Sequence, residues 1–218
     1  MKKLLTAVLS VVFLTTFSAK AEFGIGVSGA FHNMDASGTE TTRQSAEKNK
    51  GSHEEDVMIP EIFVEAMIGD NGALGISFIP KRELGTKSRT DSNSHGQDNG
   101  TYKADAKLSN VVQLYADVPM TSVGAFPIYA KLGIQHVTVQ TLESLNSGSS
   151  YPNKDLMGYT VGLGTKGDLP FVNNMYYKLE ASYTDYGTYK ADSDSDPANN
   201  VEADLESYAG KISIGMKF

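Results

Sequence analysis

Histidine, serine and carboxylate side chains are the residues of this sequence that could support hydrolytic chemistry. The chain has four histidines, His32, His53, His95 and His136. His32 and His136 fall near the ends of segments with alternating apolar residues, where a general base could activate a nearby hydroxyl such as that of Ser28. No spacing marks a catalytic triad, since geometry rather than sequence position defines one. We therefore expect a protein without enzymatic activity, with a hydrolase as one alternative.

A run of alternating aspartates, Asp192, Asp194 and Asp196, could offer oxygen ligands to a calcium ion. The run lacks the glycine and the terminal glutamate of an EF-hand loop, because Pro197 stands sixth and Ala203 twelfth. The chain has no cysteine, which excludes a thiolate metal site, a cysteine nucleophile and a disulfide scaffold. We expect no metal and no cofactor, and the three aspartates are weak candidates for a metal site.

The length and charge of the chain narrow the classes of function. Its 218 residues fit one domain, and its net charge of −7 argues against a nucleic-acid partner, which would require clustered Lys and Arg. Lys2 and Lys3 precede an apolar run over residues 4–17, and Ala19-Lys20-Ala21 follows as a small-x-small cleavage pattern. We predict a secretory signal peptide over residues 1–21 and an exported domain over residues 22–218.

Apolar residues alternate with polar or small ones in eight segments of about 11 or 12 residues, which is the periodicity of a β-strand. The segments are residues 23–34, 57–68, 73–84, 107–118, 128–139, 156–166, 175–186 and 207–218. Their length is close to the roughly 9–11 residues of a tilted strand that crosses a bilayer. The less apolar face of one segment consists of Gly158, Thr160, Gly162 and Gly164, small residues that suit a crowded barrel interior.

The connections between these segments alternate between long and short. The long ones are polar and cover residues 35–56, 85–106, 140–155 and 187–202, and the short ones cover residues 69–72, 119–127 and 167–174. Four long structureless loops are unusual in a compact soluble domain but are expected in an outer-membrane barrel. A secreted soluble barrel of the lipocalin kind shares the period of two and is the main alternative. Aromatic residues near both ends of the apolar faces favour the membrane barrel.

The end of the chain carries a family resemblance. Lys211-Ile212-Ser213-Ile214-Gly215-Met216-Lys217-Phe218 resembles the outer-membrane assembly signal, although Ser213 stands where Gly is favoured. Together with Leu114-Tyr115-Ala116-Asp117-Val118-Pro119 and Tyr183-Thr184-Asp185-Tyr186-Gly187, the chain is similar to the opacity-protein-like family of small outer-membrane barrels. The resemblance implies a Gram-negative outer membrane and no catalytic residue. It also implies that the barrel-assembly machinery reads a signal made of Tyr208, Ile212, Ile214, Met216 and Phe218. The even number of strands places both termini on the periplasmic side.

These observations predict an all-β fold: an eight-stranded antiparallel up-and-down transmembrane β-barrel with four long outer loops and short periplasmic turns. The strand alternation places seven charged residues on the inner face of this barrel: Glu61, Glu65, Asp117, Lys131, Lys178, Glu180 and Lys211. They could form a selectivity ring of a channel, or a paired network that replaces an apolar core. We favour the paired network, because eight strands enclose a space that side chains fill.

We expect a structural, adhesive or receptor-type surface protein that acts through its polar loops. Its partners would be outer-membrane lipids, lipopolysaccharide and the barrel-assembly machinery, together with a surface ligand that the sequence does not specify. A barrel hydrolase acting on lipid A or peptides and a narrow solute channel are the two alternatives.

Overall fold

The computed structural model describes residues 22–42, 47–69, 71–91, 100–144, 150–194 and 199–218. Among these residues, no helix is long and apolar enough to cross a membrane. The predicted signal peptide and Asp196 lie outside the described residues.

Antiparallel strands make up almost all of the described chain. They are β1 (Phe23–Thr42), β2 (Glu47–Ile68), β3 (Gly72–Ile79), β4 (Arg82–Asp91), β5 (Gly100–Val123), β6 (Phe126–Ser144), β7 (Lys154–Asp168), β8 (Met175–Asp192) and β9 (Asn200–Lys217). Strands that are consecutive in the sequence pair with each other, except β3 with β4, which both pair with β5. β1 also pairs with β9, so that the sheet closes into a barrel. The barrel has eight strand positions around its circumference, each of which we call a wall. β3 and β4 lie one after the other along β5 and together form the third wall.

The third wall is interrupted where the sequence predicts one continuous strand over residues 73–84. β3 ends at Ile79, and Pro80 and Lys81 separate it from β4. Proline has no N–H to donate to a sheet, which explains a break at this position.

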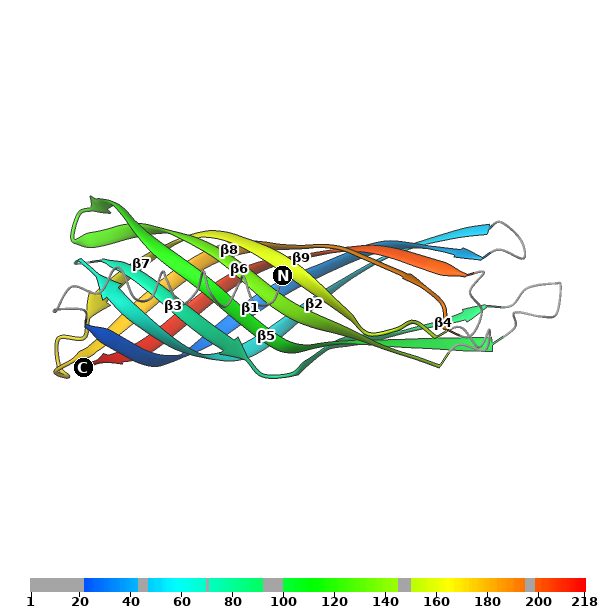
Figure 1. Ribbon diagram of the computed structural model, residues 1–218, viewed down its shortest axis with the longest axis horizontal. Helices are drawn as coiled ribbons and strands as arrows, with labels where there is room; N and C mark the ends of the chain where they lie inside the picture. Colours follow the sequence, from blue (N-terminus) through cyan, green and yellow to red (C-terminus); the bar gives the residue numbers. More distant parts are fainter. Residues whose placement is uncertain (1–21, 43–46, 70, 92–99, 145–149, 195–198) are drawn as a thin grey trace, which may run out of the picture.

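The two ends of the barrel differ (Figure 1). The short connections lie at one end, together with the start of β1 and the C-terminus, and we call this the inner end. Long paired hairpins project from the other, outer end.

The predicted bounds of the long outer connections are too wide, because the strands continue into them. β1 and β2 stay paired as far as Thr42 and Glu47, and β5 is 24 residues long. The prediction required apolar alternation to recognise a strand. Where a hairpin projects into water both of its faces can be polar, while the backbone hydrogen bonds still form.

The outer wall of the barrel is apolar, as a lipid-facing surface requires. The strands around the middle of the barrel carry exposed aliphatic side chains. Examples are Val27, Ile62, Ile76, Leu132, Val161, Leu179 and Ile212. Exposed aromatic residues lie at both edges of this band, with Phe23 and Phe218 toward the inner end and Phe31, Tyr159 and Tyr208 toward the outer end. This is the arrangement of two aromatic girdles.

Candidate functional site

The lumen, which is the space inside the barrel, holds a layer of charged side chains near its inner end. The strand alternation turns these residues inward from β2, β5, β6, β8 and β9, and each of them is buried. The structure brings together all seven charged residues that the sequence places on the inner face: Glu61, Glu65, Asp117, Lys131, Lys178, Glu180 and Lys211.

Lys178 lies at the centre of this charged layer. Its Nζ is 2.9 Å from Glu65 Oε2 and 2.5 Å from Asp117 Oδ2, and it is 3.8 Å from Glu180 Oε1. Only 2% of the side chain is exposed. One ammonium group therefore contacts carboxylates from three strands, β2, β5 and β8, and links opposite sides of the barrel.

Two further lysines complete the pairing. Lys131 Nζ lies 3.0 Å from Asp117 Oδ1 and 2.6 Å from Glu180 Oε1. Lys211 Nζ lies 3.1 Å from Glu61 Oε1 and 3.3 Å from Glu180 Oε2. Each of the four carboxylates thus has at least one lysine within ion-pair distance, which buried charges require.

Aromatic rings fill the space around these charges. The hydroxyl of Tyr115 donates to Glu65 Oε2 at 2.7 Å, and that of Tyr129 donates to Glu180 Oε1 at 3.0 Å. Lys131 Nζ also lies 3.7 Å from the centre of the Tyr115 ring, a favourable cation–π geometry. The tyrosines therefore satisfy the carboxylates by hydrogen bonds and close the remaining volume.

Glycines at the paired positions of the adjacent strands make room for these rings. A Cβ atom at Gly75 would lie 2.3 Å from the Tyr115 ring, and one at Gly164 would lie 2.5 Å from the Tyr129 ring. The glycine-lined inner face predicted from the sequence thus accommodates aromatic side chains as well as long charged ones. At this level of the lumen, the tyrosine rings pack against the backbone of the glycines.

The contents of the lumen change toward the outer end. Above the charges lies a neutral polar layer, in which Thr160 Oγ1 accepts a hydrogen bond from Gln113 at 2.9 Å and lies 2.9 Å from Thr184 Oγ1. Above it lies a buried apolar cluster of Met34, Ile59, Ile79, Leu108, Val111, Val137, Val139, Leu156, Tyr186 and Tyr189. A hydrated ion that entered the lumen from the outer end would therefore have to cross an apolar layer before it reached the charges.

The histidines do not form the dyad considered from the sequence. Ser28 Oγ lies 2.8 Å from Ser213 Oγ rather than near a histidine. His32 Nδ1 instead lies 2.9 Å from Ser207 Oγ, and that serine is 1% exposed. His136 is on the outer wall, 3.7 Å from Asp155.

The weak metal candidates fall at the outer end of β8. Asp192 and Asp194 are exposed, and the backbone N–H of Asp194 donates to Ser150 O at 2.7 Å. In the part of the chain that the structure describes, no three His, Asp or Glu residues gather closely enough to hold a metal ion.

The sequence analysis missed the aromatic members of the plug, by which we mean the charged layer together with its rings. Tyr115, Tyr129 and Tyr176 are not among the residues that the alternation was used to place on the inner face. All three have the same alternation phase as the inward charges, as Tyr129 does with Lys131. That phase is the signal that could have identified them. Lys166, which donates to Gly72 O at 3.2 Å, could have been found in the same way.

Comparison with known proteins bears on the fold. No protein-family model and no curated protein sequence matches the chain. Among solved structures, the outer membrane protein OprG from Pseudomonas aeruginosa is similar at a TM-score of 0.62 and 18% identity, over 91% of this chain and 96% of that chain. The outer membrane protein AlkL, solved by solid-state NMR in DMPC lipid bilayers, has a TM-score of 0.51 and 11% identity, over 93% and 95% of the chains. These similarities confirm the predicted fold, that of a small eight-stranded outer-membrane barrel, and at that level they agree with the opacity-like resemblance.

Proposed function

We propose that this chain is an integral outer-membrane β-barrel that is not an enzyme and has a structural, adhesive or receptor-type role at the cell surface. The observation that carries the proposal is the plugged lumen, in which Lys178 joins carboxylates from several walls. A plugged barrel offers no ion path, so its interactions fall to the hairpins at the outer end. These hairpins are polar and long, as in β1 and β2.

The proposed partners follow from the same arrangement. The apolar outer wall faces outer-membrane lipids, and the polar hairpins extend to the level of lipopolysaccharide head groups. The barrel-assembly machinery would read the last strand, on which Ile212, Ile214, Met216 and Phe218 are exposed along one face. In this proposal residues 1–21 are removed on export and both termini are periplasmic.

Burial also disfavours the hydrolase alternative. Ser207, the serine next to His32, lies in the lumen wall with almost no exposed surface. A nucleophile there could not reach a lipid or a peptide without unfolding of the wall. The exposed His136 has Asp155 beside it, and the hydroxyl of Thr138 donates to that carboxylate at 2.7 Å rather than to the imidazole.

The proposed topology predicts which positions are accessible from outside the cell. Because the chain has no cysteine, single cysteines can be introduced and labelled selectively. Ser37 is exposed on the outer extension of β1, and Ser122 is exposed beside the inner turn between β5 and β6. A membrane-impermeant maleimide should label Ser37→Cys on intact cells and Ser122→Cys only after the outer membrane has been opened. The reverse pattern would contradict the proposal.

The same assay tests the assembly signal. The backbone of Phe218 exchanges two hydrogen bonds with Phe23, at 2.9 and 3.1 Å, and so helps to close β9 against β1. A Ser37→Cys chain that lacks Phe218 should lose its label on intact cells and collect in the periplasm. Undiminished surface labelling of the truncated chain would show that Phe218 is dispensable for assembly.

A second candidate function, the passage of small apolar molecules, is favoured by a seam in the wall. Within the described residues, β2 pairs with the third wall only from Ile62 to Ile68, and no backbone pairing joins its outer part to β4. Pro60 and Pro80 stand beside the seam, and the buried Ile59 and Ile79 of the apolar cluster lie next to them. Separation of β2 from β4 would connect the apolar cluster with the surrounding lipid.

This second function predicts selectivity by polarity. Liposomes that contain the barrel should take up a small apolar dye faster than protein-free liposomes, while a charged dye of similar size should stay excluded. Equal rates of apolar dye entry with and without the barrel would remove this candidate.

A further inference from the structure

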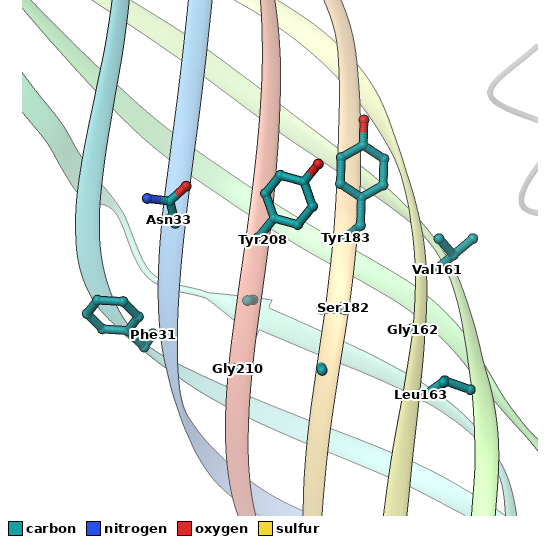
Figure 2. A pocket seen from close by; sticks show the side chains of 11 residues that line it. Phe31, Asn33, Val161, Gly162, Leu163, Ser182, Tyr183, Tyr208 and Gly210 are labelled. Carbon is teal, nitrogen blue, oxygen red and sulfur yellow. The ribbon is translucent and has the colours of Figure 1, made fainter.

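The lipid-facing wall of the barrel has a groove across β7, β8, β9 and β1 (Figure 2). Its floor includes Gly210 and Ala181, which face each other on adjacent strands. Phe31 borders it on β1 and Leu163 on β7. The groove has a volume of about 740 Å³. The groove is open on its lipid-facing side, as the seat of an acyl chain would be.

The groove exists because small residues interrupt an otherwise bulky wall. The cross-strand pair on the outer side of the floor is Tyr208 and Tyr183, whose ring centres are 5.0 Å apart. The pair on the inner side is Ile212 and Leu179. The floor is thus a shallow depression, and the side chains of Tyr208 and Tyr183 bound it on the side of the outer end. Figure 2 shows both tyrosine hydroxyls pointing away from Gly210.

Carboxylates form the next row toward the outer end. Asp35, Glu206 and Asp185 are cross-strand neighbours on β1, β9 and β8, one alternation beyond the tyrosines. The hydroxyl of Tyr183 hydrogen-bonds to Glu206, and Asp185 accepts a hydrogen bond from the backbone N–H of Gly187 at 2.7 Å.

Other charges near this row do not reverse its sign. Asn33 donates to Glu54 at 2.7 Å and to Asp56 at 3.0 Å, which adds two more carboxylates on β2. Lys190 lies farther out on β8 and is paired with Glu202 at 2.5 Å. A strongly acidic row therefore borders an apolar groove.

We propose that this groove binds a lipid with a primary-ammonium head group. Its acyl chain would lie on the floor at Gly210 and Ala181, and its ammonium group would meet the acidic row of Asp35, Glu206 and Asp185. The tyrosine pair would lie at the boundary between the two, where amphipathic rings are favoured. This inference rests on the proposed insertion of the barrel into the outer membrane.

The negative charge of the acidic row favours an ammonium lipid in the groove over a second copy of the chain. A two-fold contact across the groove would bring one acidic row against another, and like charges that face each other oppose association. A lipid ammonium group is complementary to the same row. An anionic lipid without an ammonium group is not.

The groove can be filled by one substitution that has a matched control. Gly210 and Gly29 are both exposed strand glycines, and an added Cβ atom would meet no neighbour at either position. Of these two glycines, only Gly210 lines the groove. Gly210→Leu should block the acyl chain, whereas Gly29→Leu adds the same side chain to the same wall outside the groove.

Native mass spectrometry of the mature barrel, released from nanodiscs with equal parts of phosphatidylethanolamine, phosphatidylglycerol and phosphatidylcholine, tests the proposal. The wild-type and Gly29→Leu barrels should retain phosphatidylethanolamine in preference to the other two lipids. The Gly210→Leu barrel should lose most of this retained lipid. Removing two charges, with Asp35→Asn and Glu206→Gln, should lower the preference over phosphatidylglycerol by about threefold, as expected for exposed charges.

Three results would overturn the lipid site: equal retention by Gly210→Leu and wild type, no lipid on a wild-type barrel that is folded, or a wild-type dimer that Gly210→Leu dissociates. Heat-modifiable gel mobility reports folding separately. A chain that fails to insert into nanodiscs would contradict the proposed membrane function instead.

Discussion

Replacing Lys178 by alanine should lower the free energy of unfolding of the barrel by about 3–5 kcal/mol. Lys178 Nζ is the ammonium group between Glu65 and Asp117, and its removal leaves these carboxylates short of a cation in a closed lumen. Lys131 would still pair with Asp117, but Glu65 would lose its ion pair and keep the hydrogen bond from the Tyr115 hydroxyl. An uncompensated buried charge is the source of the cost. Urea unfolding in detergent micelles, followed by heat-modifiable gel mobility, measures the change.

A lysine on the same strand provides the control. Lys190 pairs with Glu202 at 2.5 Å, but both side chains are more than half exposed. Lys190→Ala should therefore cost about 1 kcal/mol or less, because water replaces the lost partner. Equal stability losses for the two variants would mean that the inner charges are hydrated, and the plug would then not be closed.

Gly75→Val should destabilise the barrel by about 1–3 kcal/mol, the usual cost of overpacking. Its new Cβ atom would lie 2.3 Å from the Tyr115 ring, which cannot move freely because its hydroxyl donates to Glu65. Gly29→Val is the matched control, since a Cβ atom at Gly29 meets no neighbour, and its cost should stay within about 0.5 kcal/mol. The same unfolding assay measures both variants.

A double variant isolates the collision. If the ring is what Gly75→Val meets, then the loss caused by Gly75→Val should shrink in a Tyr115→Ala background, a coupling that a double-mutant cycle detects. Additive losses would contradict the packing of Tyr115 against bare backbone. The variants also separate the two components of the plug, since Lys178 tests its charges and Gly75 tests its rings.

The barrel class could be predicted from the sequence because each strand has lipid on one side and the filled lumen on the other. Apolar residues must then alternate with polar or small ones along the strand. Ile212 and Ile214 face out while Lys211 and Ser213 face in, and the same rule holds for all eight walls. Strand length could not be predicted in this way. Outside the apolar band, a hairpin such as that formed by β1 and β2 contacts water on both faces. Its sequence therefore has no alternation of polar and apolar residues.

The inward charges could be predicted from the same alternation, but their partners could not. Which lysine meets which carboxylate depends on the stagger of the strands around the barrel, as in the contact of Lys178 with Glu65 across 113 positions of sequence. The break at Pro80 was missed because the apolar pattern continues on both sides of it. The outer groove was missed because it depends on Gly210 and Ala181 standing side by side on different strands.

We expect the lumen to be closed by a plug of paired charges and aromatic rings. Planar-bilayer recording of the refolded wild-type barrel tests it most directly, because even a narrow continuous water path would carry current. A closed lumen should carry no steady current at any applied voltage that the bilayer withstands. Stable, ohmic conductance carried by several kinds of ion would contradict the claim and would establish the narrow solute channel in its place.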